Sequence, residues 1–379
     1  FNFYNTGSPT VADSFTNPGK MSGFVASYSS SGQYKWSQSI GGSYDDEATA
    51  ITETTAGIVV AADGMGTVYF DTAQTASVAA ASTTYTSGFL VGYTLDGAYS
   101  WNYKLYPSSS SYNIEISALT TNDNDHIVAA VEYSYALSGS KDGGSATTIV
   151  SSNPKNSVYD AALLDFSNDG TYNEVIYTVA GVATSSNNYD DYIADVKMTS
   201  DGGILLGGWY YSADGLDLDR DGSTNGIFDF NDVEGSYTSD GFLVKLNGDY
   251  QVEASTRYYG DGYDGVLGVG ETPNGSYVTA GFFSSTTLNA LSNKVKAQSG
   301  SDTTISTNVK GNFDGFIAVE GIAAAEVPSL QNIEIKNEVK TFKVTTEVRK
   351  HLEDDVEVAG GDIDGEEGTF NGVTYSKDG

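Results

Sequence analysis

The sequence contains no cysteine and few basic residues. Among 379 residues there are 6 prolines, 2 histidines and 18 lysines and arginines. Without cysteine, disulfides, thiolate metal sites and cysteine nucleophiles are excluded. No apolar run reaches the length of a transmembrane helix, and no signal peptide begins at Phe1. The 50 acidic residues give a net charge of −32, which repels phosphate backbones and anionic lipids, so we expect neither nucleic-acid binding nor direct membrane insertion.

Glycine and aromatic residues are abundant where helix-forming residues are scarce. The chain has 44 glycines and 27 tyrosines, and aromatic residues make up 12% of it. Serine and threonine are frequent, whereas leucine, glutamate and lysine are scarce outside the last stretch. This composition favours short strands joined by polar turns. The surplus of carboxylates suits divalent cations, and it serves solubility equally well without a ligand.

One short pattern recurs five times, with a degenerate third copy. An acid or a serine, a glycine and a phenylalanine precede an apolar run. The second residues of the copies stand at positions 23, 88, 161, 241 and 315, which are 65, 73, 80 and 74 residues apart. Internal similarity at such a period is the sequence signature of a repeat architecture. The copies are Ser22-Gly23-Phe24-Val25, Ser87-Gly88-Phe89-Leu90, Asp160-Ala161-Ala162-Leu163, Asp240-Gly241-Phe242-Leu243 and Asp314-Gly315-Phe316-Ile317.

Each copy continues in the same order. After the first apolar run comes a turn, predicted at Asp96-Gly97 in the second copy and at Asn247-Gly248 in the fourth. A second strand follows, which holds Trp36 in the first copy and Trp101 in the second. A tyrosine with an acid or amide then precedes a third strand, and a turn leads to an apolar fourth strand. Four short strands joined by turns are typical of one blade of a β-propeller.

A long polar insertion follows the fourth strand of every copy. A propeller blade takes about 40–50 residues, so the insertions account for the longer period. Insertions at one position of a repeat lie on one face of the array, commonly the binding face. We therefore predict an all-β fold, a β-propeller of four-stranded blades with long insertions on one face, followed by a small β-sandwich-like module. The insertions span residues 67–87, 138–159, 212–239 and 284–313.

The composition changes after Pro328, where lysine, glutamate and valine rise. We expect the propeller to occupy residues 1–322 and a linker to occupy 323–330. Alternating apolar and charged residues in 331–379 predict a β-rich, stalk-like module that is incomplete. The opening residues match an insertion rather than the start of a unit, so we interpret the chain as a mature or trimmed piece of a longer protein.

The repeat resembles the blade repeats of bacterial secreted β-propeller proteins. The likeness rests on the Gly-Phe start, the tryptophan strand, the step at Gly41–Glu47 and the apolar fourth strand, and it covers about residues 1–321. The third copy departs from it, since it lacks both the Gly-Phe pair and the tryptophan. Residues 342–347, 359–366 and 373–375 resemble β-rich stalk modules of clostridial cell-wall-anchored surface proteins. Together the resemblances imply an adhesin-like protein on a Gram-positive cell surface, wall-anchored at full length, but not its chemistry.

The sharpest local motif is an acidic loop in the third insertion. Alternating carboxylates precede a glycine, a pattern that resembles the calcium loop of EF-hand-like and dockerin-like repeats. Position twelve of the loop is Phe228, so the closing carboxylate is Asp229 or Asp232. We expect an isolated structural Ca²⁺ site that orders the insertion, and a metal-free acidic loop is the alternative. The expected ligands are Asp217, Asp219, Asp221, Ser223, Asn225, Asp229 and Asp232.

Two further groups of residues are candidates for contact with a ligand. The acids of the tyrosine steps either line a ligand site or cap turns, and their recurrence in the units favours the second role. A set of aromatic residues either offers stacking faces or packs in the core. His126 is expected to be structural, and no hydrolase, metalloprotease or nucleotide-binding motif is present. The acids are Asp45, Asp46, Asp190, Asp191, Asp261 and Asp264, and the aromatic residues are Trp209, Tyr210, Tyr211, Tyr258 and Tyr259.

These observations favour a non-enzymatic extracellular binding or display head, assisted by Ca²⁺, that recognises a glycan or a protein. No catalytic residue and no organic cofactor is predicted. The first alternative is an extracellular carbohydrate-active enzyme, a glycoside hydrolase or lyase, which needs two facing carboxylates on a propeller face. The second alternative is a structural surface-layer or stalk element.

Overall fold

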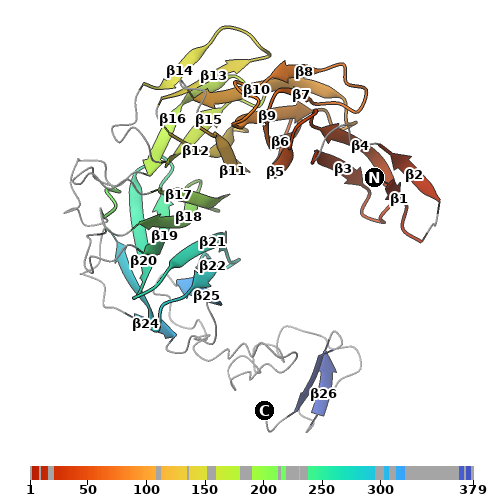
Figure 1. The fold of residues 1–379 in the computed structure, drawn as a ribbon. Coiled ribbons are helices and arrows are strands. Elements are labelled where there is room, and N and C mark those ends of the chain that lie inside the picture. Colours follow the sequence, from red (N-terminus) through yellow and green to blue (C-terminus); the bar gives the residue numbers. More distant parts are fainter. Residues whose placement is uncertain are drawn as a thin grey trace.

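The chain curves into an open arc of antiparallel β-sheets (Figure 1). The computed structural model describes residues 2–7, 10–15, 21–107, 112–134, 136–151, 159–179, 190–211, 215–218, 230, 238–294, 303–306, 313–320, 367–370 and 373–376. Every regular element in these ranges is a β-strand, which confirms the predicted all-β class. No helix there is long and apolar enough to cross a membrane.

Three sheets in the middle of the arc repeat one pattern. A tight hairpin supplies the two strands on the inner side, and the next hairpin along the chain continues the sheet outward (Figure 1). The second sheet contains β5 (Glu47–Thr54), β6 (Gly57–Gly64), β9 (Ser87–Tyr93) and β10 (Tyr99–Pro107). The third contains β11 (Glu115–Thr121), β12 (Ile127–Tyr133), β15 (Asp160–Phe166) and β16 (Tyr172–Val179). The fourth contains β17 (Tyr192–Met198), β18 (Ile204–Tyr211), β19 (Ser239–Leu246) and β20 (Val252–Tyr259).

The sheets at the two ends of the arc are smaller. The first sheet is the outward hairpin alone, β3 (Gly23–Tyr28) with β4 (Tyr34–Ile40). The fifth contains β21 (Asp264–Glu271), β22 (Tyr277–Phe283) and β25 (Asp314–Glu320). Outside this series lie the first hairpin of the chain, β1 (Asn2–Tyr4) with β2 (Val11–Ser14), and the last described one, β26 (Glu367–Phe370) with β27 (Val373–Ser376). The predicted linker and most of the predicted stalk module fall outside the described residues.

The sheets do not coincide with the units of the sequence repeat. The first strand of the second unit, β9, pairs with β6, the fourth strand of the first unit. β15 pairs with β12 and β19 with β18 in the same way. The quartets that were expected to form one blade each are therefore split between two neighbouring sheets. Alternation of apolar residues predicts where a strand lies, but it does not select the strand with which it pairs.

The described segments of the long insertions lie along the outer edges of the sheets instead of standing free on one face, which corrects the expectation for these segments. Each described insertion segment lies against the outermost strand of the preceding sheet. This protects a strand edge that would otherwise offer unpaired backbone groups. The hairpin of β7 (Thr67–Tyr69) and β8 (Ser77–Ala79) reaches the end of β4 through a bridge between Tyr69 and Gly41. The hairpin of β13 (Leu137–Lys141) and β14 (Thr147–Val150) pairs with β10 through β13. The hairpin of β23 (Leu288–Lys294) and β24 (Thr303–Ser306) pairs with β20 through β23. In the third insertion, the Leu218 carbonyl accepts a hydrogen bond of 2.7 Å from Tyr177 of β16.

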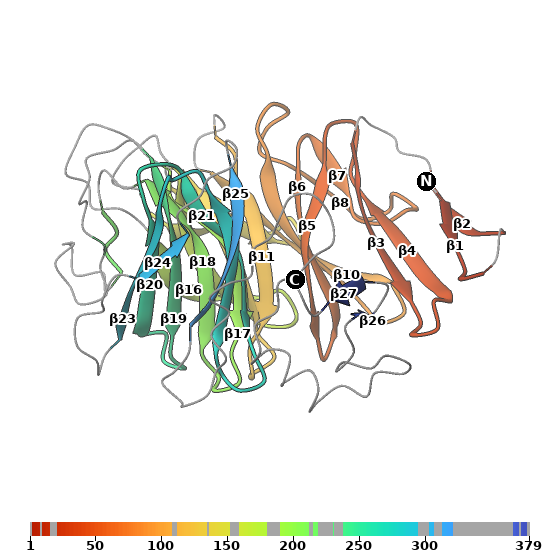
Figure 2. The same cartoon turned by 90° about the horizontal axis from the view of Figure 1, so that it is seen from below.

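The apolar core of the described residues consists of four layers between neighbouring sheets, which Figure 2 shows in a second view. The layers follow one rule. The apolar residue after the Gly-Phe pair faces the following sheet, and the residue at the Phe position of that sheet faces back. Each interior sheet therefore buries both of its faces. The pairs that share a layer are Val25 with Phe89, Leu90 with Ala162, Leu163 with Phe242, and Leu243 with Phe316.

Turn glycines of the outward hairpins contact the tryptophan of the preceding sheet. Gly97 and Gly170 have φ angles of +83° and +81°, which glycine adopts without strain. A Cβ atom on Gly170 would lie 2.3 Å from the Trp101 ring. In the fourth copy the turn contains the predicted Asn247-Gly248 pair, but its left-handed residue is Tyr250, with φ of +59°.

Replacing Gly170 with alanine is expected to lower the free energy of unfolding by about 2–4 kcal/mol, because the left-handed backbone and the clash with Trp101 add together. Gly143→Ala is the matched control, since Gly143 has φ of +70° but no atom within 4 Å of its Cβ position. Urea unfolding of both variants checks the difference. Equal losses would show that the contact with Trp101 contributes nothing.

Candidate ligand-binding surface on the inner side of the arc

The four innermost strands share a β-bulge at the same position. A register shift interrupts β5, β11, β17 and β21, each against the strand that follows it. Because a bulge bends a strand and redirects the side chains beside it, the shared position gives the four strands the same local geometry. The bulged residues are Thr49, Ser117, Ala194 and Leu267.

Bulged residues also join one sheet to the next. The Thr49 hydroxyl donates to the carbonyl of Ile116 at 2.6 Å, and the Ser117 hydroxyl donates to the carbonyl of Ile193 at 2.5 Å. Ala194 lacks a hydroxyl, and at that junction the Asp195 carboxylate accepts from the amide of Val269 at 2.9 Å. These contacts fix the innermost strands relative to one another.

Cross-strand pairs just before the bulges form a continuous series along the inner side. Glu47 lies opposite Asp63 in the second sheet, and Glu115 lies opposite Glu132 in the third. At the same distance before the bulge, Tyr192 lies opposite Trp209 in the fourth sheet, and Gly265 lies opposite Phe282 in the fifth sheet. Carboxylates thus occupy two successive sheets and aromatic rings the next two. We define the inner carboxylate row as Glu47, Asp63, Glu115, Glu132 and Asp190, the last of which lies two residues before β17.

Three members of the inner carboxylate row, Asp63, Glu115 and Glu132, have pKa values that burial and neighbouring carboxylates raise. Burial raises the pKa of Glu132 to about 8, with further contributions from Glu115 and Asp190. Burial also raises the pKa of Asp63 well above its ordinary value, and Glu115, Glu47 and Glu132 add to the effect. The amide of Ile116 donates to Asp63 at 3.3 Å, which opposes the shift only in part. In the described part of the chain no lysine, arginine or histidine forms an ion pair with the row.

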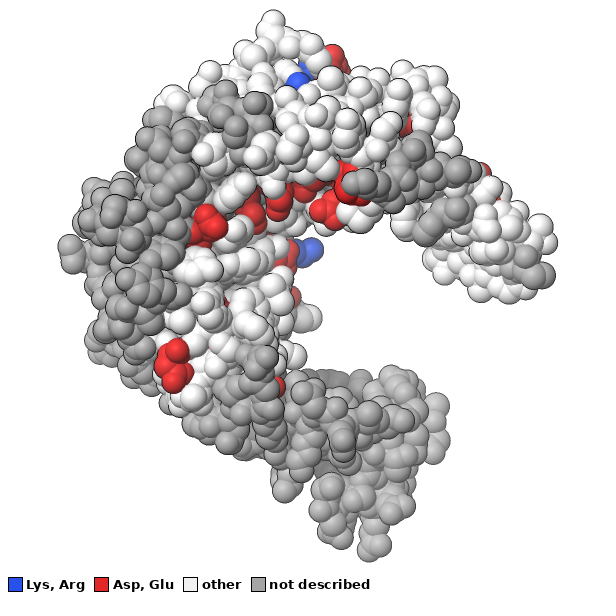
Figure 3. Space-filling view, viewed as in Figure 1, with Lys and Arg blue, Asp and Glu red and all other residues white. Residues whose placement is uncertain are grey.

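Aromatic rings adjoin one end of the row. The Tyr192 hydroxyl donates to the Asp190 carboxylate at 3.2 Å. The Tyr192 ring lies 5.0 Å from that of Trp209, and the Trp209 ring lies 6.0 Å from that of Phe282. Figure 3 shows acidic side chains gathered along the concave inner side of the arc. The surface therefore joins a strong negative field to a short run of aromatic faces.

This arrangement suits recognition of positive charge and of flat or hydroxyl-bearing groups. Carboxylates on a concave surface concentrate cationic ligands, and aromatic faces contact cations and sugar rings. Among the described residues no group of three or more histidines or acids is placed so that it could hold a metal ion.

The predicted calcium loop lies almost entirely outside the described residues. Of its seven expected ligands only Asp217 is described, and it stands between two core residues, Leu216 and Leu218. The other six, Asp219, Asp221, Ser223, Asn225, Asp229 and Asp232, belong to the part that the structure does not describe. The calcium site stays a prediction.

The predicted aromatic set divides into buried and partly exposed members. Tyr210 and Tyr258 are fully buried. The Tyr210 ring stacks at 5.8 Å on Phe230, and the Tyr258 hydroxyl donates to Thr279 at 3.1 Å. The expectation of ligand-stacking faces is wrong for these two tyrosines, which pack in the core because their side chains point between sheets. The partly exposed members are Trp209, Tyr211 and Tyr259, of which Trp209 adjoins the inner carboxylate row.

Most acids of the tyrosine steps tie turns and strands together. Asp46, Asp191 and Asp264 occupy equivalent positions in three sheets, and all are buried. Asp46 accepts from the amides of Gly42 at 2.6 Å and Met65 at 3.1 Å, and burial raises its pKa to about 6. Asp264 accepts from the Ser285 hydroxyl at 2.6 Å, and burial raises its pKa to about 7.

The remaining three acids of this set have different surroundings. The exposed Asp261 accepts from the amide of Thr286 at 2.6 Å and from its hydroxyl at 2.8 Å. Asp45 is partly exposed and forms an isolated β-bridge with Met21. Asp190 belongs to the inner carboxylate row, where it also accepts from the amide of Tyr159 at 2.9 Å. Hydrogen bonding to turns thus accounts for most of the set, and contact with a ligand remains a proposal for Asp190.

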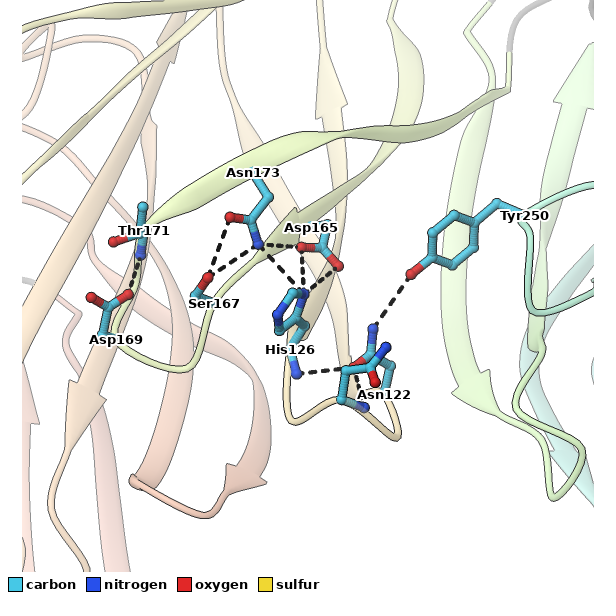
Figure 4. Close-up of polar contacts among 9 residues, drawn as sticks. Asn122, His126, Asp165, Ser167, Asp169, Thr171, Asn173 and Tyr250 are labelled. Carbon is cyan, nitrogen blue, oxygen red and sulfur yellow. Dashed lines mark hydrogen bonds and ion pairs between the residues drawn. The ribbon is translucent and has the colours of Figure 1, made fainter.

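His126 lies at the opposite end of the third sheet from the inner carboxylate row, among the polar contacts that Figure 4 shows. Its Nδ1 lies 2.9 Å from the Asp165 carboxylate. Its amide donates to the Asn122 side chain at 2.9 Å, and Asn122 donates to the Tyr250 hydroxyl of the next sheet at 3.4 Å. The histidine is held in a polar network that joins two sheets.

Sequence reasoning missed four members of the inner carboxylate row. Glu47 and Glu115 each begin the third strand of a unit, and aligning the units could have identified them. Asp63 and Glu132 end the following strand, and only the pairing register brings them opposite the first two. Their proximity could not be derived from either strand alone.

No protein family and no curated protein matches the sequence. Among solved structures, a protein of unknown function from Bacteroides caccae is similar at 11% identity, with a TM-score of 0.19. The match covers 60% of this chain and 91% of that protein.

Proposed function

We propose that the chain is an arc of a β-propeller that serves as a non-enzymatic binding head at a bacterial cell surface. The repeated antiparallel sheets support the propeller proposal, since each places its first hairpin on the inner side of the arc (Figure 1). In this arrangement the blades are built from two successive sequence units, and the insertions lock neighbouring blades. The cell-surface location follows from the resemblance of the repeat and of the C-terminal segments.

A single observation carries the binding role. At one level of four successive sheets, cross-strand pairs hold first carboxylates and then aromatic rings, and of the carboxylates in these pairs Glu47 and Glu115 are exposed whereas Asp63 and Glu132 are buried. Like charges directly opposite one another destabilise a sheet. Glu115 and Glu132 nevertheless stand opposite each other, and the row has no basic partner in the described part. Glu132, whose pKa is raised to about 8, avoids this repulsion by holding a proton at neutral pH, and a cationic ligand would favour its ionised form.

The ligand that fits this surface best carries positive charge, either as a basic protein segment or as an amino-bearing glycan. Amino or guanidinium groups would contact the carboxylates, and the remainder would lie on Tyr192 and Trp209, whose rings are 5.0 Å apart. The net charge of −32 would speed the approach of such a ligand and make binding weaken with salt.

Binding is tested with chitosan oligosaccharides and an arginine-rich peptide, with neutral chito-oligosaccharides as the reference. We expect wild-type protein to bind a cationic probe, with an affinity that falls as salt rises. Glu47→Gln with Glu115→Gln should weaken it about tenfold or more, because two exposed members of the row lose their charge. Glu53→Gln with Glu174→Gln removes the same charge from exposed sites outside the row. Equal weakening by both pairs, or no binding, would reject the proposal.

The calcium loop is retained as part of this proposal. Ca²⁺ would order the third insertion, whose described residues Leu216 and Leu218 pack on the third sheet, and so would support the arc from outside. The binding measurements are therefore made with millimolar Ca²⁺ and with a chelator. If calorimetry detects no heat when Ca²⁺ is added, the calcium part of the proposal is rejected. The proposal for the inner surface is then unaffected.

A carbohydrate-active enzyme is the second candidate, and one observation favours it. Glu132, with its pKa raised to about 8, could serve as an acid beside Glu115, which lies directly opposite. Glycosidases use two carboxyl groups of this kind. Release of reducing sugar from a polysaccharide, abolished in Glu115→Gln, would favour the enzyme over the binding head.

A further inference from the structure

Glu132 differs from other acids buried at the end of the sheets that carries the inner carboxylate row, because its carboxyl group has no hydrogen-bond partner among the described residues. It is only 8% exposed, and in the ranges that the structure describes it forms no ion pair either. Asp46, Asp63 and Asp264 are buried as well, and each accepts a hydrogen bond from the chain. A buried polar group without a partner is rare in folded proteins and calls for a physical explanation.

The titratable groups that interact with Glu132 are acids and tyrosines. Burial, and after it Glu115 and Asp190, raises the pKa of Glu132 to about 8. The carboxyl group therefore holds a proton at neutral pH in the free protein. Glu132 in turn adds to the effect of burial on the pKa values of its neighbours. The groups that interact with it are Asp63 of β6, Glu115 of β11, Tyr159 before β15, Asp190 before β17 and Tyr192 of β17.

The junction between the third and fourth sheets already holds one arginine between a carboxylate and an aromatic ring. Glu132 alternates with Ala130 and so lies on the face of the third sheet that packs against the fourth. Arg257 lies on the opposing face of the fourth sheet, where its Nε donates to Asp240 at 2.9 Å and its guanidinium carbon lies 4.6 Å from the centre of the Tyr259 ring. This arrangement shows how a guanidinium group is held at this junction.

We infer, on the basis of the proposed binding function, that Glu132 receives the positive charge of the ligand, an arginine side chain of a basic protein segment, in exchange for the proton that it holds in the free protein. In the exchange the O–H bond of the carboxyl group breaks, the proton passes to the solvent, and the guanidinium group keeps its own charge. Glu115, directly opposite, offers a second carboxylate to the guanidinium donors, and the ring of Tyr192 offers a flat face.

Binding that displaces a proton tightens as the pH rises. An arginine side chain keeps its charge throughout the neutral range, so the pH dependence of its affinity reports on the protein alone. Glu132, with its pKa of about 8 in the free protein, keeps its proton at lower pH, and the ligand competes with that proton. The affinity therefore rises with pH until Glu132 is ionised in the free protein and then levels off.

Calorimetric titration of the full chain with an arginine-rich peptide, at pH 6 to 9 and constant salt, tests the inference. Titration in two buffers with different ionisation enthalpies counts the protons that binding releases. We expect release of about one proton at pH 7 and an affinity that rises at least about tenfold from pH 6 to pH 8. Glu132→Gln should abolish both effects and weaken binding at pH 8 by about tenfold or more. Glu174→Gln, an exposed change on β16 outside the row, should preserve both.

The outcomes separate this inference from the proposed function on which it rests. A wild-type protein that binds the peptide without releasing a proton overturns the inference and leaves the binding head intact. Proton release that persists in Glu132→Gln also overturns it, because another acid such as Asp63 would then be the source. Binding of chitosan oligosaccharides without binding of the peptide overturns the choice of arginine. If no cationic probe binds, the proposed function itself is rejected. The proton count in the wild type stays informative even if Glu132→Gln is less stable.

Discussion

Replacing Arg257 with methionine is expected to cost about 3–5 kcal/mol of unfolding free energy, because it leaves the buried Asp240 carboxylate without its cation. The two side chains lie on the face of the fourth sheet that packs against the third sheet, the face that holds Phe242 and Tyr210, and both are almost fully buried. The Arg257 guanidinium donates to one carboxylate oxygen of Asp240 through Nε at 2.9 Å and through a terminal nitrogen at 2.5 Å. The loss of Arg257 would also change the surroundings of Asp264, whose pKa is raised to about 7 by burial and in part by Asp240.

The double variant Asp240→Leu with Arg257→Met distinguishes a buried ion pair from general damage to the core. Apolar residues of similar volume remove both charges, so much of the lost stability should return. Lys141→Met is the matched control, since the Lys141–Asp169 pair is exposed and its loss should cost less than about 1 kcal/mol. Urea unfolding of the wild type, Arg257→Met, the double variant and Lys141→Met measures whether their unfolding free energies follow this order. A double variant as unstable as Arg257→Met would contradict the argument.

The repeat made the strands predictable but not the sheets. Gly-Phe starts and turn residues placed β3, β9, β19 and β25 correctly, because local turn chemistry and alternation act within a few residues. Pairing of β9 with β6 depends on contacts between units, which alternation does not encode. The position of the insertions was likewise not predictable, since β13 and β23 find their partners on the preceding sheet.

The candidate surface depended on features that sequence alone does not reveal. Asp190 was recognised as an acid of a tyrosine step, but the repeat gave no reason to separate it from the buried Asp191 beside it. One residue along a strand reverses the face, and a bulge changes the alternation again. Glu47 and Asp63, which are 16 positions apart, become neighbours only through the register of β5 and β6. The prediction that Tyr210 offers a stacking face to a ligand is wrong for the same reason, because the Tyr210 side chain points into a layer between sheets.

The inner carboxylate row should make the protein lose stability as the pH rises from mildly acidic to alkaline. Glu132 has a pKa of about 8 in the folded chain, raised by burial and then by Glu115 and Asp190, against an ordinary value of 4.5. The folded state thus holds its proton more tightly than the unfolded state. Its contribution to stability is full below about pH 4.5 and is lost as the pH rises through about 8. Asp46 and Asp264 act in the same direction, with folded pKa values of about 6 and 7.

Glu132→Gln isolates the share of this one carboxyl group. Glutamine resembles the protonated acid in shape but cannot ionise, so the variant should match wild type at pH 5 and exceed its stability at pH 9. Each unit of pKa shift is worth about 1.4 kcal/mol, so the gain at pH 9 should reach a few kcal/mol. Urea midpoints at pH 5, 7 and 9 measure it, and Glu174→Gln, an exposed change on β16, should leave the wild-type pH dependence unaltered. If Glu132→Gln loses as much stability between pH 5 and 9 as wild type, Glu132 is not a carboxyl group that holds its proton at neutral pH.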